Sequence, residues 1–230
     1  MVMKRRKGFT LIELVVATFI FGFIIIAMAI IYSTSTRYMH QNYRQDVWKT
    51  NTALAMRTIH HKLLVATRID SPAFGASGAE LKFAVNVDQL TGCYPISPGD
   101  PVTWHYFYLG SVSPAPPLSQ LFYCSGNITG GAGCANSPPF PGAPSYTCVG
   151  ASPPILILDH VAPIVPVFSR QNAQDVNERD TVAVNLRIHW DPTKLSDTGK
   201  SLGASQRVIN YSLKTVIKIN RPAEGQLATD

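Results

Sequence analysis

The chain has 230 residues, and its 20 Lys and Arg against 14 Asp and Glu give a formal net charge of +6 at pH 7. Four of the basic residues, Lys4, Arg5, Arg6 and Lys7, are clustered near the N-terminus, and without them the net charge is only +2. A nucleic-acid-binding surface needs clustered Lys and Arg. The next basic residues are instead spread along a predicted helix, at Arg37, Arg44, Lys49, Arg57, Lys62 and Arg68. The composition therefore argues against nucleic acid as a partner.

The basic stretch is followed by an apolar run from Phe9 to Ile31. As a helix, the 23 residues of this run would be about 35 Å long, which is enough to cross a bilayer. Because the basic residues precede the run, we expect them to stay in the cytoplasm and everything after Ile31 to be delivered outside. A cleaved secretory signal fits less well, since its apolar region spans only about 7–15 residues. A plain single-pass anchor is a second alternative.

One carboxylate, Glu13, lies inside the apolar run. An acidic side chain at the centre of a membrane helix costs about 2.5–3.5 kcal/mol on the insertion scale, so we expect a cationic partner. Cleavage between Gly8 and Phe9 would create an α-amino group four residues before Glu13. That amine is the natural counter-ion, from the same chain or from a neighbouring copy.

The residues from Gly8 to Glu13, GFTLIE, resemble the class III leader junction of type IV prepilins and type II secretion pseudopilins. The resemblance implies that a prepilin peptidase cuts after Gly8 and methylates the amine of Phe9. It also implies that Glu13 then pairs with the methylated N-terminus of an adjacent subunit. An inner-membrane assembly platform would lift the subunit from the membrane into a filament.

Beyond the membrane run, a helical pattern extends from Tyr32 to about Arg68. Apolar residues recur at spacings of three, four and seven, which predicts one buried stripe: Tyr32, Met39, Tyr43, Val47, Leu54, Ile59, Leu63 and Leu64. Ser71-Pro72 and the glycines at 75 and 78 should end the helix. We therefore expect one helix of about 60 residues, roughly 90 Å long, apolar in its first half and amphipathic in its second.

After residue 80 the hydrophobic pattern alternates, which is typical of strands. The clearest strands cover residues 181–190 and 209–219, and further candidates cover 81–87, 102–108, 118–124 and 155–161. An antiparallel sheet packed on the C-terminal half of the long helix would bury both apolar faces, so the predicted fold class is α+β. The expected organisation is a leader (1–8), a transmembrane or filament-core half-helix (9–31), its amphipathic continuation (32–70) and an extracytoplasmic β-rich head (71–230).

Two irregular segments, 91–101 and 110–154, are rich in Pro, Gly and Ser, and the second exceeds the usual loop length of a compact domain. Cys93, Cys124, Cys134 and Cys148 lie in or beside them. Because this half is assigned outside the cytoplasm, we expect disulfides. Of the three possible pairings we favour Cys124–Cys134 with Cys93–Cys148. A zinc site fits less well, because there is no C-x-x-C pair and no histidine at ligand spacing.

No catalytic constellation is present, so we predict a protein that is not an enzyme and has no cofactor. His60 and His61 are adjacent on a helix, whereas a helical metal pair needs i,i+4 spacing. Asp159-His160 is interpreted as a polar pair at a strand end. The acidic cluster of Asp175, Glu178 and Asp180 is interpreted as a solvated loop, and no metal site is assigned.

A looser resemblance, over residues 54–67 and 155–220, is to the W-type minor pilin of type IV pili and the J-type pseudopilin of type II secretion. It implies a minor subunit at or near the tip of a pilus or pseudopilus, held in the inner membrane before assembly. The long Pro/Gly-rich insertion departs from that layout. The alternatives are a major pilin, or an adhesin-like or ligand-binding head. Such a head would use aromatic residues that alternate in strands and are more often core: Tyr94, Trp104, Tyr106, Tyr108, Phe122, Tyr123 and Tyr146.

Overall fold

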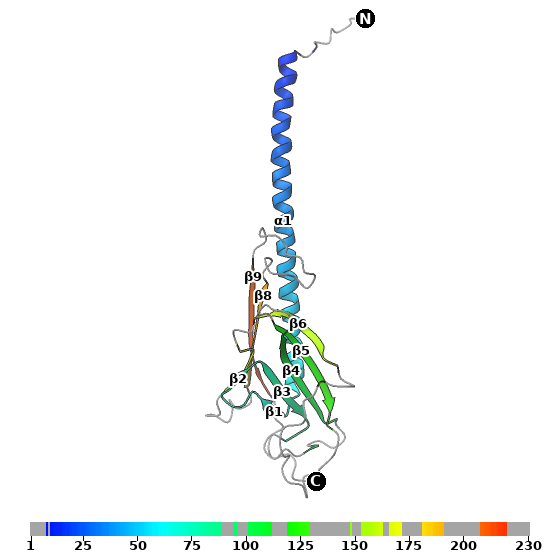
Figure 1. Cartoon of the computed structure of the whole chain (residues 1–230), viewed down its shortest axis with the longest axis vertical. Coiled ribbons are helices and arrows are strands. Elements are labelled where there is room, and N and C mark those ends of the chain that lie inside the picture. Colours follow the sequence, from blue (N-terminus) through cyan, green and yellow to red (C-terminus); the bar gives the residue numbers. More distant parts are fainter. Residues whose placement is uncertain are drawn as a thin grey trace, which may run out of the picture. The chain divides into compact units, whose positions relative to one another are not determined.

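The computed structural model of the protein describes residues 8, 10–88, 94–95, 101–111, 119–128, 148, 153–162, 166–171, 181–190 and 208–219. The chain forms two compact units, residues 1–46 and 47–230. One helix, α1 (Leu11–Leu64), contributes to both units, and all the strands belong to the second (Figure 1).

In the first unit, no side chain of α1 is buried. The helix is long and apolar enough to cross a membrane. Some of its hydroxyl groups donate to the helix backbone: Thr18 to the Val15 carbonyl at 2.9 Å and Ser33 to the Ile30 carbonyl at 3.0 Å. Hydroxyls bonded in this way to the preceding turn are not left unpaired, so they do not oppose contact with hydrocarbon.

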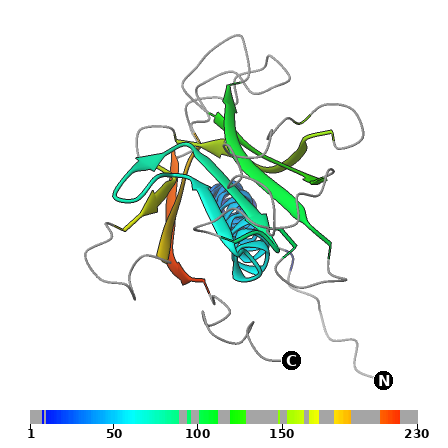
Figure 2. The same ribbon diagram turned by 90° about the horizontal axis from the view of Figure 1, so that it is seen from below.

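The second unit is an antiparallel sheet that curves around the C-terminal part of α1 (Figure 2). The strands pair in the order β1-β3-β4-β5-β6-β8-β7-β2, with β9 also paired to β8. Their bounds are β1 Arg68–Ser71, β2 Ser77–Gly78, β3 Glu80–Val85, β4 Thr103–Ser111, β5 Ser119–Asn127, β6 Ile155–Val161, β7 Phe168–Arg170, β8 Thr181–Trp190 and β9 Ile209–Lys218. The predicted α+β fold class is confirmed.

The core forms between one face of α1 and the concave face of the sheet. The helix contributes five buried residues, Thr52, Ala55, Met56, Ile59 and Leu63. The fully buried sheet residues include Phe83, Phe107, Phe168 and Leu186. The predicted stripe was right at Ile59 and Leu63. It was wrong at its other positions, whose side chains are exposed: Tyr32, Met39, Tyr43, Val47, Leu54 and Leu64. Thr52, Ala55 and Met56 complete the buried face of the helix instead.

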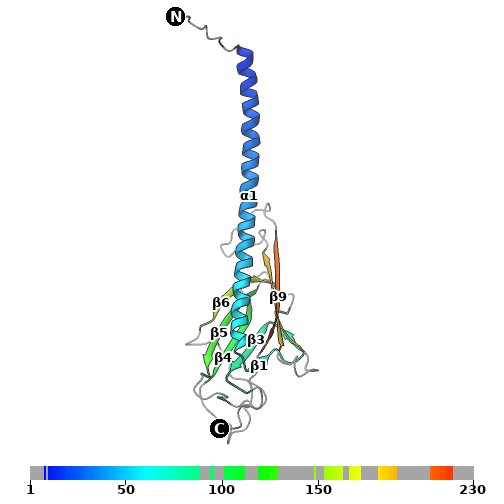
Figure 3. The same cartoon turned by 180° about the vertical axis from the view of Figure 1, so that it is seen from behind.

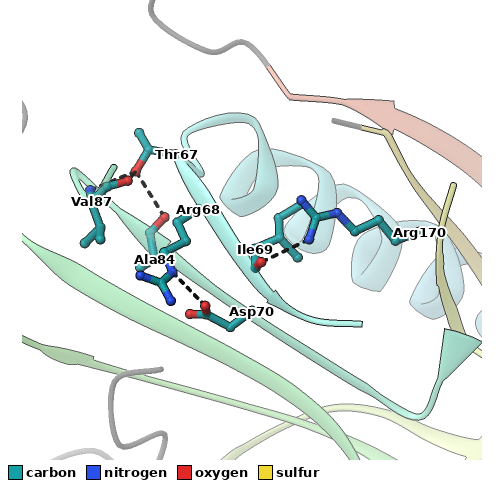
Figure 4. A network of polar contacts seen from close by, with 7 residues as sticks. All are labelled: Thr67, Arg68, Ile69, Asp70, Ala84, Val87 and Arg170. Atoms are coloured by element: carbon teal, nitrogen blue, oxygen red, sulfur yellow. Dashed lines mark hydrogen bonds and ion pairs between the residues drawn. The ribbon is translucent and has the colours of Figure 1, made fainter. Parts of the chain in front are cut away.

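The end of α1 is tied to the sheet by a polar network (Figure 4). The Thr67 N–H donates to the Ala84 carbonyl at 3.0 Å, and the Thr67 hydroxyl bonds both the carbonyl (2.7 Å) and the N–H (2.9 Å) of Val87. The buried Arg170 guanidinium donates to the Ile69 carbonyl at 3.0 Å. These bonds pair backbone groups of the segment that follows the helix with groups of the sheet and of the residues just after β3.

The helix ends at Leu64, so the predicted continuation to Arg68 was wrong. Residues 68–71 instead form β1, paired with β3. The sheet also contains β2 and β7, which the sequence analysis did not identify. Each of these three strands has four residues or fewer, too few to show an alternating pattern, and each forms because a longer neighbour offers it hydrogen bonds.

His105, on β4, is a titratable residue of the core. Its ring lies 5.0 Å from the Phe83 ring between centroids, and its Nδ1 atom is 2.8 Å from the Tyr123 hydroxyl. Burial, with a contribution from the positive charge of Lys62, lowers the pKa of His105 from 6.5 to about 4. The neutral form is therefore the one that fits the core.

We predict that the head loses stability as the pH falls from about 6.5 to about 4. In this window the unfolded chain takes up a proton at His105 while the folded head does not. The free energy of unfolding should therefore fall by about 3 kcal/mol once the pH is below 4. Urea denaturation of the full chain in detergent, followed by near-ultraviolet circular dichroism, should show the decline. His105→Gln should remove most of this pH dependence, whereas His61→Gln, at an exposed helix position, should keep it. An unchanged slope in His105→Gln would show that other groups cause it.

Candidate functional site

The N-terminus of α1 is closed by a reciprocal pair of side chains, Thr10 and Glu13. The Glu13 Oε2 atom accepts hydrogen bonds from the Thr10 N–H at 3.0 Å and from the Thr10 hydroxyl at 2.9 Å. In return, the Glu13 N–H donates to the Thr10 hydroxyl oxygen at 3.4 Å. Thr10 is thus the N-cap residue and Glu13 the third helical residue, which is the arrangement of a capping box.

This geometry leaves Glu13 able to interact with a second group. Both hydrogen bonds of its carboxylate use Oε2, and Oε1 has no partner among the described residues. The side chain is exposed and lies in the first turn, where the helix dipole favours a negative charge. The carboxylate can therefore hold its own helix terminus with one oxygen and accept a cation at the other.

Of the three residues predicted to act at the leader junction and in assembly, the structure describes two. Gly8 is exposed and precedes the helix, Glu13 is in its first turn, and Phe9 lies outside the described residues. The sequence analysis missed Thr10. Its signal was present as the pattern T-x-x-E immediately before an apolar run, which marks a capping box.

A disulfide joins Cys124 to Cys148, with 5.8 Å between the Cα atoms. The expected pairings of Cys124 with Cys134 and of Cys93 with Cys148 were therefore wrong. The topology explains the difference: β6 pairs with β5, and Ile155 lies opposite Tyr123, so the chain leading into β6 returns beside Cys124. Cys93 and Cys134 themselves lie outside the described residues.

The aromatic residues of β4 and β5 divide between the two faces of the sheet. Phe107 and Tyr123 belong to the core, whereas Tyr106, Tyr108 and Phe122 lie on the convex face. There the rings stack on one another, with centroids 4.7 Å apart for the tyrosine pair and 5.5 Å for Tyr108 and Phe122. The expectation that these alternating aromatics are core was wrong for the convex set. Their faces are nevertheless occupied by neighbouring rings.

Asp159 and His160 lie where β6 bulges from β5, at an irregularity between Ser119 and Leu121. His160 has a φ of 58°, which is uncommon for a residue with a side chain. Its N–H donates to Asp159 Oδ1 at 2.7 Å, and its ring packs on that of Trp48 with centroids 4.8 Å apart. The pair therefore fixes the imidazole against α1. Within the described ranges, no three His, Cys, Asp or Glu residues gather where they could hold a metal; Asp175, Glu178 and Asp180 lie outside those ranges.

Residues 3–29 match the family model of the prokaryotic N-terminal methylation motif. The matched residues contain Gly8, the capping pair and the first part of the apolar helix, and the match supports a type IV pilin-like family for the chain. No curated protein and no solved structure matches the chain.

We predict that Thr10→Ala loosens the first turn of α1. Loss of an N-cap side chain costs typically about 1 kcal/mol, so the amides of Glu13 and Leu14 should exchange hydrogen about fivefold faster. Hydrogen exchange of the full chain in detergent micelles measures this. The matched control is Thr18→Ala, whose hydroxyl only bonds its own helix backbone and which should leave first-turn exchange unchanged. Equal exchange in Thr10→Ala and the unmodified chain would contradict the capping role.

Proposed function

We propose that this chain is a minor pilin or pseudopilin subunit, cut between Gly8 and Phe9, methylated at Phe9 and assembled through Glu13 into a type IV pilus or a type II secretion pseudopilus. The observation that carries the proposal is the Glu13 carboxylate: it lies in the first turn of an apolar helix, inside a methylation motif, and one of its oxygens has no partner among the described residues. A carboxylate there needs a positive partner once the helix is in hydrocarbon.

The new amino group of Phe9 is the partner that this geometry suits. An amine with positive charge can bond the free Oε1 atom while Oε2 keeps its bonds to Thr10. Methylation of a primary amine retains its positive charge and removes one N–H donor. The capping pair thus holds the carboxylate in place for an adjacent subunit.

The remaining parts of the chain fit a structural subunit. The exposed apolar half of α1 would anchor the chain in the inner membrane and then pack among similar helices in the filament. The head would lie in the periplasm or at the cell surface, where its disulfide is chemically stable. The partners are then prepilin peptidase, the assembly platform and other subunits, and a position at or near the tip would suit a minor subunit with a large head.

A ligand-binding head is the second candidate function, favoured by the convex aromatic rings. Gly110 leaves room for the Phe122 ring, because a Cβ there would come within 2.7 Å of a Phe122 ring atom. The Lys82 ammonium lies 4.8 Å from the Tyr106 ring centroid and closes one end of the stack. Because the rings cover one another's faces, they leave little aromatic face for a ligand, and a structural role is the better proposal.

Two substitutions at one residue separate charge from capping. Glu13→Gln keeps an amide oxygen that can accept the Thr10 bonds but removes the negative charge. We predict that Glu13→Gln and Glu13→Val are both inserted in the membrane and processed, and that both are lost from sheared filaments by about tenfold or more. Thr10→Ala, which keeps the charge, should reduce incorporation much less. Incorporation of Glu13→Gln at the unmodified level, measured by immunoblot of filaments against membranes, would refute the charge-pairing role.

A further inference from the structure

The convex face of β8 and β9 is positively charged. Its outward residues are paired across the two strands as Thr181 with Lys218, Ala183 with Val216, Asn185 with Lys214, Arg187 with Ser212 and His189 with Asn210. Arg187, Lys214 and Lys218 are exposed, and neither strand contains a carboxylate. None of the three cations forms an ion pair in the described part of the chain. This face therefore presents a row of unneutralised positive charge.

A hollow of about 240 Å³ lies beside Arg187, lined also by Asn185, Asn210, Tyr211 and Ser212. The guanidinium, the two amides and the two hydroxyls can all donate hydrogen bonds, and only the amides and hydroxyls can accept them. The Asn210 amide oxygen is already bonded to His189 Nδ1 at 2.7 Å. The hollow is thus suited to a carboxylate, for which a guanidinium offers two parallel donors.

The strand beside this face has a free edge. β9 pairs with β8 along one side over all ten of its residues. Among the described residues, none is hydrogen-bonded to its other side, and β9 lies at the border of this part of the sheet (Figures 1 and 3). Every second residue of an antiparallel edge strand directs its N–H and C=O away from its neighbour. Such an edge is a template for another strand.

We propose that the free edge of β9 binds an extended acidic segment of a different protein, which adds a strand to the sheet and sets its carboxylates against Arg187, Lys214 and Lys218. An added strand lies about 4.8 Å from β9 and repeats its side chains on one face every second residue. Carboxylates at alternate positions of the added strand would therefore lie beside Ser212, Lys214 and Lys218 of β9. This interaction does not depend on the proposed assembly through Glu13.

A second copy of the chain does not supply this occupant from its described residues. The described residues after Val47 include four carboxylates, Asp70, Glu80, Asp88 and Asp159. Each of these carboxylates interacts within its own chain. No described strand carries two carboxylates at alternate positions. A nucleic acid could neutralise the cations but has no peptide groups to continue the ladder of β9. An acidic strand is the partner that satisfies both features.

The test uses the full chain in detergent micelles and a fluorescent ten-residue peptide of alternating Glu and Thr, with binding measured by anisotropy at low salt. K214E/K218E should bind this peptide at least about tenfold more weakly than the unmodified chain. R37E/R57E changes the net charge equally at exposed positions of α1 and should alter binding by less than about twofold. A peptide of alternating Lys and Thr should instead bind K214E/K218E more tightly than the unmodified chain.

Two further probes separate strand addition from simple charge attraction. A Glu-Thr peptide methylated at alternate backbone nitrogens cannot complete the ladder, so its affinity should fall about tenfold or more. Equal binding of the methylated peptide would overturn the proposal. Tighter binding of a decathymidylate than of the Glu-Thr peptide, or no binding of that peptide at about 1 mM, would overturn it as well.

Discussion

A single carboxylate at the start of an apolar helix is the constraint on which the proposed function depends. Glu13 would be costly in hydrocarbon as an isolated charge. In the structure Thr10 supplies two donors to one of its oxygens, and no other described residue bonds the second oxygen. The capping box needs the carboxylate for the helix terminus, and the proposed assembly needs its charge. The same side chain can serve both because it has two oxygens.

The head is organised around the C-terminal part of α1. Small and medium side chains on one helix face meet large aromatic and aliphatic residues of the sheet. The Thr67 hydrogen bonds hold the segment after the helix against β3, and the Arg170 bond joins β7 to β1. The helix therefore cannot be exchanged for an unrelated anchor without losing part of the core of the head.

The parts of the fold that were predictable are those with long, regular patterns. The strands at 155–161 and 181–190 were placed at their observed bounds, because each is marked by a run of strand-forming apolar residues. The short strands β1, β2 and β7 could not be found, since two to four residues show no period. The partner of Cys124 depends on the pairing of β5 with β6, which no local pattern contains. Thr10, in contrast, could have been recognised from its spacing to Glu13.

Mass spectrometry of the N-terminal peptide of the native protein is the decisive experiment for the proposed pairing of Glu13. We expect a peptide that begins at Phe9 and carries one additional methyl group on its α-amine, so that a positive charge exists beside the carboxylate in the assembled filament. A native chain that still begins with its basic leader, or that begins after Ile31 without Glu13, would show that this pairing does not occur.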